Sequence, residues 1–319
     1  MKIVAADIGG THARFALAAL EAGAAPRLGE IRKYRTRDYP GLAEVWARFE
    51  KDSENPLPRA AALAVAAPIE SDVLTFMNSS WRLDRHRLKD ELGLDKLSLL
   101  NDFGAVAHTV SMTPAEDFIP IAGPGALPAD GITSVLGPGT GLGVAILDRR
   151  HGEVRVIETE ASHIGFSPLD PEEEELADFL TARYGRASVE RVVSGPGLID
   201  IYQFLGGGAA PEADQAGLLW DAAISGADPQ AERALSILVR CFGTAAGDIA
   251  LAQGAMGLAI TGGLANRIQH LLKSPAFEAR FTAKGRYRER MQRTPVRLLT
   301  TQEPGLLGAA IAFQRGFGI

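Results

Sequence analysis

The stretch KIVAADIGGTHARFAL, residues Lys2–Leu17, joins two apolar runs through a turn that carries an aspartate, two glycines and a threonine. The runs KIVAADI and ARFALAAL predict the two strands of a β-hairpin, because a Gly-rich turn of about four residues separates them. Taken alone, Asp7 and the glycines are ordinary turn residues, since glycine adopts positive φ and aspartate bonds its own backbone. Whether this turn also binds a ligand depends on the rest of the sequence.

The same pattern returns in ITSVLGPGTGLGVAILD, residues Ile132–Asp148. The two patterns lie about 130 residues apart, from Asp7 to Gly137, and predict two similar halves that each open with a glycine-tipped hairpin. The alternative is that Gly-rich hairpins recur by chance in an α/β protein. A third glycine turn, Gly262–Gly263, follows the apolar run GLAI and precedes a helical pattern.

Apolar strand-like runs and helical patterns alternate along the whole chain, which predicts an α/β protein. The segment PGLAEVWARFEKD has helical spacing, and EPGLLGAAIAFQRG predicts a closing helix. In LDPEEEELADFLTARYG, Asp170 suits the N-cap, Pro171 the first helical position and Gly185 the C′ position. The four glutamates of residues 172–175 are predicted to lie on the surface, where they favour the helix dipole.

Composition restricts the function classes. A length of 319 residues predicts two domains, and a net charge of −6 gives no electrostatic basis for binding nucleic acid. The basic segment 279–293 is predicted to be a solvated surface. Cys241 is the only cysteine, so an intramolecular disulfide and a cysteine zinc cluster are excluded. With no secretory pattern and no apolar run judged long enough to cross a bilayer, we expect a cytoplasmic protein without a membrane partner.

Glycine at a strand end lets the backbone approach a ligand closely and direct its N–H groups at an anion. Two such hairpins would hold the phosphates of a nucleotide between two domains, and Thr11 and Thr140 would add hydroxyl donors. A carboxylate beside phosphates suits Mg²⁺, so Asp7 is the candidate magnesium residue, acting through water. The sequence has no Walker A loop, no G-x-G-x-x-G, no G-x-S-x-G and no H-E-x-x-H.

Polar residues follow other strand-like runs. Asn101 and Asp102 stand where LSLL ends and a helical pattern begins, so Asp102 is either an N-cap or a ligand at the carboxyl end of a strand. Glu160 and His163 occur in ETEASHIGF, and Glu190 precedes a Gly-Pro-Gly turn. Together these side chains offer the acceptors that a polyhydroxylated substrate needs.

These motifs, in this order, resemble those of the bacterial ATP-dependent glucokinases of the hexokinase, actin and Hsp70 superfold. DIGGTHARFAL resembles the first phosphate motif, LGPGTGLGVA the second, and ITGGLANR the adenosine motif. LNDF resembles the segment with the catalytic aspartate, ETEASH the sugar-binding Glu-x-x-His, and ERVVSGPGLIDIY the segment with a further sugar-binding glutamate. EPGLLGAA also fits, and the single cysteine argues against the related ROK kinases with their cysteine-rich zinc cluster.

The resemblance implies a two-domain ribonuclease-H-like (actin-like ATPase) α/β fold with the active site in the interdomain cleft. We expect a small domain, residues 1–108 plus 303–319, and a large domain, residues 109–302. Asp102 would be the catalytic base, and Asn101, Asp102, Glu160, His163 and Glu190 would bind the sugar. The implied nucleotide site comprises Ala6, Asp7, Ile8, Gly9, Gly10, Thr11, Gly139, Thr140, Gly141, Gly262 and Gly263.

The implied reaction is transfer of the γ-phosphoryl group of ATP, with Mg²⁺, to the 6-hydroxyl of D-glucose, the first step of glycolysis, by a homodimer. The alternatives are another hexose kinase on the same scaffold and a catalytically weak sugar-binding regulator; an ATPase machine would have no use for the sugar-type residues. Three positions depart from the family pattern: His12 replaces Asn, Ala161–Ser162 replace Gly-Gly, and GGLANR replaces GGIVPR. The second change concerns the shape of the sugar pocket and the third the adenine preference.

Overall fold

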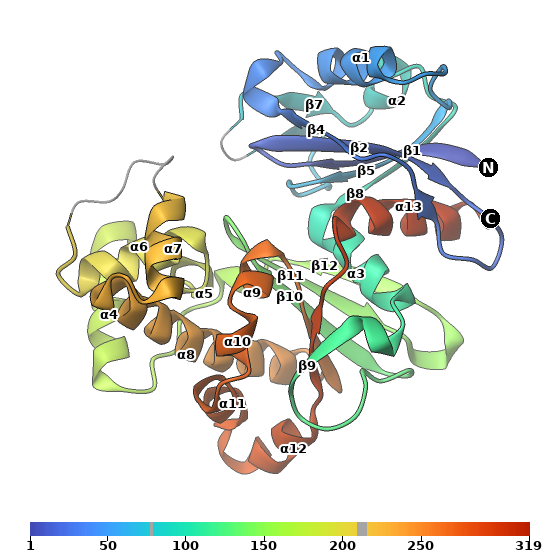
Figure 1. Ribbon diagram of the computed structural model, residues 1–319. Helices are drawn as coiled ribbons and strands as arrows, with labels where there is room; N and C mark the ends of the chain where they lie inside the picture. Colours follow the sequence, from blue (N-terminus) through green and yellow to red (C-terminus); the bar gives the residue numbers. More distant parts are fainter. Residues whose placement is uncertain (77–78, 209–215) are drawn as a thin grey trace. The chain divides into compact units, whose positions relative to one another are not determined.

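The computed structural model describes residues 1–76, 79–208 and 216–319 (Figure 1). The chain divides into two compact units. Unit 1 consists of Met1–Thr113 together with Thr301–Ile319, and unit 2 consists of Pro114–Thr300.

Unit 1 contains a six-stranded sheet made of β1 (Lys2–Ile8), β2 (His12–Ala19), β3 (Arg27–Leu28), β4 (Arg32–Arg35), β5 (Ala60–Val65) and β8 (Lys96–Asn101). The strand order is β3-β2-β1-β5-β8, and β4 also pairs with β2. β1 and β2 form the predicted antiparallel hairpin, whereas β5 and β8 continue the sheet in parallel. Because parallel strands end at the same edge, the turn after β1 and the end of β8 share one edge. A separate ribbon pairs β6 (Val73–Thr75) with β7 (Arg82–Asp84).

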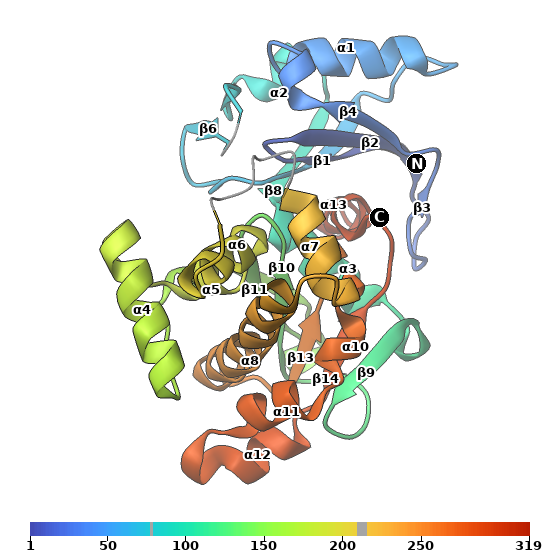
Figure 2. The same ribbon diagram turned by 60° about the vertical axis from the view of Figure 1, so that its left-hand side comes forward.

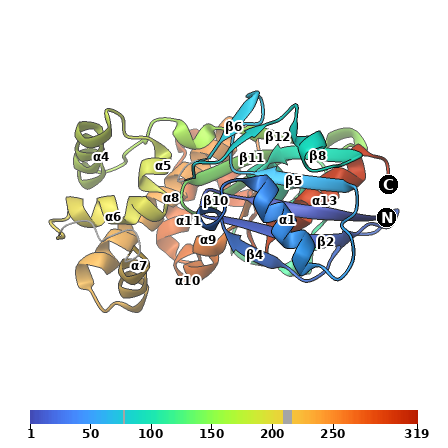
Figure 3. The ribbon, with the colours of Figure 1, turned by 90° about the horizontal axis from the view of Figure 1, so that it is seen from above.

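Helices cover both faces of this sheet (Figures 1 and 3). They are η1 (Thr36–Asp38), α1 (Leu42–Asp52), α2 (Leu88–Glu91), α3 (Asp102–Met112) and α13 (Pro304–Gly316). Side chains on one face of β1 pack with α1, whose buried stripe of Leu42, Val45, Trp46 and Phe49 has the predicted helical spacing. Ile3 and Ala5 point to the other face and pack with α13, the predicted closing helix.

The packing of α13 on α3 is very close at Gly308. A Cβ at Gly308 would lie 1.6 Å from the Ala105 carbonyl oxygen, so glycine is required for the two helix backbones to approach. Near the other end of α13, Arg315 Nη1 donates to His108 Nδ1 at 3.0 Å and to Ser111 Oγ at 2.8 Å. This helix pair matters for the candidate site, because α3 begins at Asp102 and α13 begins beside Asp7.

Unit 2 repeats the strand pattern of unit 1 in a second six-stranded sheet made of β9 (Phe118–Ala122), β10 (Ile132–Pro138), β11 (Leu142–Asp148), β12 (Arg155–Thr159), β13 (Gly257–Ile260) and β14 (Val296–Leu299). Its order is β12-β11-β10-β13-β14-β9. β10 and β11 form an antiparallel hairpin, and β13 and β14 follow in parallel, as β5 and β8 follow the first hairpin. This shared order and direction supports the predicted duplication rather than chance recurrence of hairpins.

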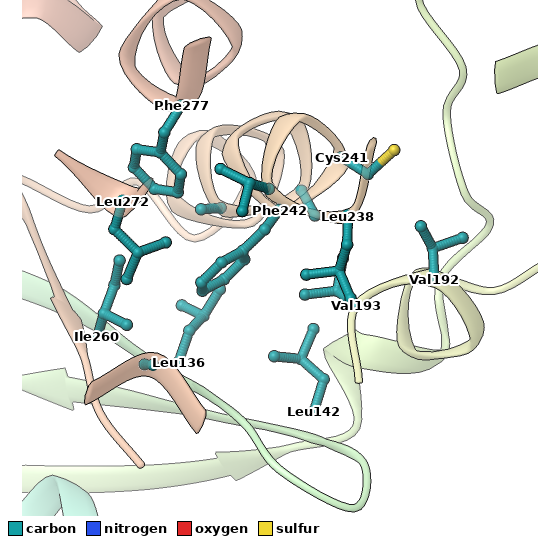
Figure 4. Packing of buried hydrophobic residues seen from close by; sticks show 14 of the residues in the cluster. Leu136, Leu142, Val192, Val193, Leu238, Cys241, Phe242, Ile260, Leu272 and Phe277 are labelled. Atoms are coloured by element: carbon teal, nitrogen blue, oxygen red, sulfur yellow. The ribbon is translucent and has the colours of Figure 1, made fainter. Parts of the chain in front are cut away.

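The helices of unit 2 include α8 (Pro229–Ala252), which lies along the sheet (Figure 2). The others are η2 (Ala115–Asp117), η3 (Arg150–Gly152), η4 (Ala161–His163), α4 (Pro171–Tyr184), α5 (Val189–Val192), α6 (Gly195–Phe204), α7 (Ala216–Ser225), α9 (Gly263–Arg267), α10 (Gln269–Leu272), α11 (Pro275–Thr282), η5 (Gly285–Tyr287) and α12 (Arg288–Arg293). Figure 4 shows Phe242 of α8 over Leu136 of the hairpin, and Leu142 close to Val193.

The expectation that no apolar run is long enough to span a bilayer was wrong for α8. Its 24 residues include a window of mean hydropathy 1.5, which is long and apolar enough for a span by length and composition. That window is 78% buried within the protein, as in the central helix of a folded core. Cys241 of α8 is fully buried.

α4 confirms its predicted ends and corrects one prediction. Asp170 caps the helix by accepting from the Glu173 N–H at 3.0 Å, and Gly185 ends it at φ 77°. The glutamates do not all lie on the surface, because the Glu173 side chain is fully buried and pairs with Arg280 at 2.9 Å. Arg280 belongs to the basic segment predicted to be a solvated surface, so that prediction was wrong at this residue as well.

We predict that Gly308→Ala destabilises unit 1 by about 3 kcal/mol or more, because overpacking against a backbone oxygen cannot be relieved by a side-chain movement. Gly316→Ala, in the same helix, has no neighbouring atom within 4 Å of its Cβ position. It should be neutral or stabilise by up to about 1 kcal/mol through helix propensity. Urea denaturation of both variants provides the comparison, and equal stabilities would refute the close packing.

We also predict a pH effect centred on His108. Burial, and secondarily the Arg315 charge, lower the pKa of His108 from 6.5 to about 4. Between these values the unfolded chain binds a proton that the folded chain does not, so stability falls as the pH falls. His108→Gln keeps an acceptor for Arg315 but does not titrate. Between pH 7 and pH 5 the variant should therefore lose about 1–2 kcal/mol less stability than the parent in urea denaturation; parallel losses would count against this assignment.

Candidate active site

The first hairpin places Asp7 directly opposite Arg14 in the antiparallel register. Arg14 Nη1 lies 3.3 Å from Asp7 Oδ2, and Arg14 Nε lies 2.8 Å from Glu303 Oε2. A single guanidinium therefore bridges two carboxylates, one at the end of β1 and one at the start of α13. Glu303 adopts φ 48°, a left-handed conformation that is uncommon for a residue with a side chain.

Burial raises the pKa of Asp7, and the Glu303 charge adds to this, while Arg14 opposes both. Gly305 leaves room for the carboxyl group, because a Cβ there would lie 3.1 Å from Asp7 Cγ. Magnesium is commonly bound through one carboxylate with water and phosphate oxygens, so a single aspartate fits the predicted role. Among the described residues, no group of three or more His, Cys, Asp or Glu side chains could hold a metal ion.

The turn of this hairpin is fixed by backbone contacts. The Gly9 N–H donates to the His12 carbonyl at 2.9 Å, and Thr36 Oγ1 donates to the Gly10 carbonyl at 2.6 Å. The Thr36 N–H also donates to the Thr11 carbonyl at 3.1 Å. Of the other predicted nucleotide residues, Ala6 and Ile8 are fully buried in the core, so they would offer a ligand only their backbone.

Asn101 and Asp102 lie at the junction of β8 and α3. Asn101 is the N-cap, because its Oδ1 accepts from the N–H groups of Phe103 at 2.8 Å and Gly104 at 3.3 Å. Asp102 is the first residue of the helix, and its Oδ1 also accepts from the Phe103 N–H at 2.8 Å. The capping role considered for Asp102 thus belongs to Asn101. The positive end of the helix dipole favours the ionised form of a carboxyl group at this position.

In unit 2 the structure brings two of the glycine turns together. The tip of the second hairpin, Gly139–Gly141, is closed by a 2.7 Å bond from the Gly139 N–H to the Gly141 carbonyl. Gly262 follows the neighbouring parallel strand with φ 98°, and a Cβ there would lie 3.2 Å from the Pro138 carbonyl oxygen. The close approach and the positive φ both favour glycine at this position.

The structure also brings together the three predicted sugar residues of unit 2. His163 Nε2 lies 3.6 Å from Glu160 Oε2, and His163 Nδ1 lies 4.0 Å from Glu190 Oε1. Glu190 Oε2 accepts from the Leu142 N–H at 2.9 Å, directly after the tip of the second hairpin. Glu160 and His163 are more than half exposed at 66% and 55%, whereas Glu190 is 21% exposed. These side chains form a polar, accessible cluster beside a glycine turn.

Comparison with known proteins decides the family. A protein-family model described as glucokinase matches residues 4–316. A glucokinase of Zymomonas mobilis subsp. mobilis is 46% identical over 319 residues, with 98% of each chain covered. The chain belongs to the glucokinase family. The family predicted from the sequence motifs is thereby confirmed.

Solved structures agree with the glucokinase fold. The crystal structure of a glucokinase from an Antarctic psychrotroph superposes with a TM-score of 0.84 at 29% identity, covering 98% of this chain and 99% of that one. A Balamuthia mandrillaris glucokinase, crystallised in complex with glucose, has a TM-score of 0.79 at 24% identity, covering 99% and 94% of the two chains, and supports the fold alone. The predicted α/β fold of the actin-like ATPase type is confirmed.

The departure at Ala161–Ser162 is accommodated without strain. Both residues lie in η4, and neither is among the residues with positive φ, so the backbone here does not require glycine. Ser162 is buried, while Glu160 and His163 on either side remain exposed. The replacement therefore leaves the Glu-x-x-His spacing of this glucokinase-family chain intact.

Sequence reasoning missed the residues that surround Asp7. The sequence predicts only that Arg14 lies in a strand and that Glu303 lies in a closing helix. The period-2 pattern of the hairpin contained a signal for Arg14, because it stands directly across the turn from Asp7. No comparable signal exists for Glu303, since its contact with Arg14 joins segments 289 residues apart (303 − 14).

We predict that Arg14→Met lowers the free energy of unfolding by about 1–3 kcal/mol at pH 7, because it leaves two partly buried carboxylates without their shared cation. The deficit should shrink at pH 5, since burial already raises the pKa of Asp7 and a protonated carboxyl needs no cation. Arg27→Met, which removes an exposed pair with Glu21 in the same sheet, is the control and should cost less than about 1 kcal/mol. Chemical denaturation at both pH values measures the difference; a deficit that grows on acidification would contradict the bridging role.

Proposed function

We propose that this protein is a glucokinase that transfers the γ-phosphoryl group of ATP to the 6-hydroxyl of D-glucose, giving glucose 6-phosphate and ADP. The observation that carries the proposal is the convergence of Glu160, His163 and Glu190 beside the second glycine hairpin, in a chain of the glucokinase family. A binding site for sugar hydroxyls adjoins a backbone turn suited to phosphates, as phosphoryl transfer to a sugar requires.

Asp102 is the proposed general base, and it accepts the proton of the 6-hydroxyl as that oxygen attacks the γ-phosphorus. Its position at the start of α3 follows from the Asn101 cap, and the helix dipole favours a negative charge in this first turn. Phosphoryl transfer has a loose transition state, so positioning and charge neutralisation supply most of the catalysis. The domain arrangement proposed here is a small domain of residues 1–108 and 303–319 and a large one of residues 109–302.

Asn101, Glu160, His163 and Glu190 are the proposed sugar ligands. Once a bound sugar covers these groups, each one left unpaired costs about 1–3 kcal/mol, so such a set discriminates against sugars that lack or invert a hydroxyl. The two hairpins and the Gly262–Gly263 turn are proposed to hold ATP through their backbone N–H groups.

Asp7 is the proposed Mg²⁺ residue, through water, and the ion neutralises phosphate charge when bound. Arg14 holds the Asp7 carboxylate, and Gly305 provides the space for it. A homodimer in the cytoplasm completes the proposal. The homodimer rests on the family resemblance. The compartment rests on a single buried cysteine with no disulfide partner in the sequence.

The direct test is a coupled assay for glucose 6-phosphate with purified protein, ATP and Mg²⁺, run beside mannose, fructose and amino sugars. Turnover restricted to glucose supports a glucokinase. Faster turnover of another hexose supports the rival sugar kinase. Calorimetric glucose binding without any turnover supports the regulator.

We predict that Asp102→Asn lowers turnover by about 10²–10⁴-fold or more, because a general base typically contributes this much. Glucose affinity measured by calorimetry should persist. Asp95→Asn is the matched control: Asp95 directly precedes β8, is 66% exposed and pairs with Arg59, so turnover should stay at the parent level. Near-normal turnover of Asp102→Asn would show that another group takes the proton.

A further inference from the structure

The second hairpin is tied to the segment that carries Glu190 by two hydrogen bonds. The Leu142 N–H donates to Glu190 Oε2 at 2.9 Å, and the Gly195 N–H donates to the Gly139 carbonyl at 2.7 Å. One bond is made by a side chain, the other by backbone alone. The Gly139–Gly141 turn, a proposed phosphate site, and the segment that carries Glu190, a proposed sugar ligand, are therefore connected within unit 2.

Gly141 lies directly against the carboxylate in this connection. A Cβ at Gly141 would be 2.4 Å from Glu190 Oε2 and 3.1 Å from Glu190 Cδ. Gly139, at the other side of the same tip, has no atom within 4 Å of its Cβ position. A methyl group at Gly141 thus displaces the Glu190 carboxylate, whereas one at Gly139 meets open space.

The backbone of the Glu190 segment is rigidly held, so the side chain is the part that yields. Val192 and Val193 are fully buried in the same core cluster as Leu142, and Figure 4 shows Val193 next to Leu142. Ser194 Oγ accepts from the Gly197 N–H at 3.1 Å, and Trp220 Nε1 donates to the Gly195 carbonyl at 3.2 Å. A steric clash at Gly141 is therefore relieved by rotation of the Glu190 side chain.

The second oxygen of the same carboxylate faces the sugar residues. Glu190 Oε1 lies 4.0 Å from His163 Nδ1, and His163 in turn lies 3.6 Å from Glu160. A single carboxylate thus faces the hairpin with one oxygen and the sugar cluster with the other. A change in the position of the Glu190 carboxylate therefore alters its contact with the hairpin and its contact with the sugar cluster together.

We propose that Glu190 couples sugar binding to nucleotide binding, and that Gly141 governs sugar affinity through the position of the Glu190 carboxylate. The inference rests on the proposed function. A sugar that bonds Glu190 holds the carboxylate in the rotamer that accepts the Leu142 N–H, which fixes the hairpin for phosphates. By linkage, bound nucleotide tightens sugar binding by the same factor, in the range of about 5–150-fold that is typical of such coupling.

The first experiment measures glucose affinity by calorimetry without nucleotide. Gly141→Ala should weaken glucose binding about tenfold or more, since it removes a sugar ligand from its place. Gly217→Ala, in α7 of the same unit and with no atom within 4 Å of its Cβ position, is the control and should leave glucose affinity unchanged. Equal glucose affinities for Gly141→Ala and the parent, with a parent that binds glucose and ATP, would overturn this inference and leave the proposed function standing. A parent that binds neither would overturn the proposed function itself.

A second variant separates displacement of Glu190 from direct obstruction of the sugar or poor folding. Glu190→Asp shortens the side chain so that it no longer reaches the Leu142 N–H, and it should weaken glucose binding as Gly141→Ala does. The double variant should bind glucose no more weakly than the weaker of the two single variants, because both changes break the same contact. Fully additive losses would refute the shared contact.

The coupling itself is measured with ADP and glucose. In the parent, saturating glucose should tighten ADP binding, and in Gly141→Ala this factor should fall to about one. Glu160→Gln should weaken glucose binding and preserve the factor, since the contact described for the Glu160 carboxylate is with His163. A factor that survives in Gly141→Ala, or that is one in the parent, would refute the coupling.

Discussion

The parallel pairing of a hairpin strand with the strands beside it is the constraint on which both units depend. In unit 1 it aligns the ends of β1, β5 and β8, and in unit 2 it aligns the ends of β10 and β13. Parallel strands end at one edge, so turns that are distant in the sequence become neighbours. The Asp7 turn thereby shares an edge with Asn101, and the second hairpin meets Gly262. The chemistry of each half follows from this alignment of strand ends.

Local signals explain what the sequence could predict about the fold. The ends of α4 follow from Asp170, Pro171 and Gly185, which act within a few residues of themselves. The same reasoning failed at Glu173, because its burial depends on Arg280, which stands 107 positions further along the chain (280 − 173). It also failed for α8, where a helix that fills a core has the apolar length of a membrane span. The failure at Glu173 came from tertiary packing, which leaves no periodic trace in a single sequence, whereas the apolar length of α8 is visible in its composition.

The candidate site also has local contacts that the sequence predicts and long-range contacts that it does not. Glu160 and His163 are three residues apart, so their proximity in η4 could be anticipated from spacing. The bond between Glu190 and Leu142 joins positions 48 residues apart, and the glycine at position 141 was the only sign of close approach. Asn101 and Asp102 were placed correctly at the strand end, but the N-cap role considered for Asp102 belongs to Asn101. Adjacent Asn and Asp are both good N-caps, so composition alone does not choose between them.

The discontinuity of unit 1 has a consequence for how the chain is made. Unit 2 is a single continuous segment, whereas unit 1 needs α13 to cover one face of its sheet. During synthesis, residues 1–113 emerge first but keep that apolar face open until α13 has left the ribosome. Unit 2 can fold in the meantime, since domains fold as units once their residues are available. The half that emerges first is therefore completed last, because one face of its sheet stays uncovered until α13 is available.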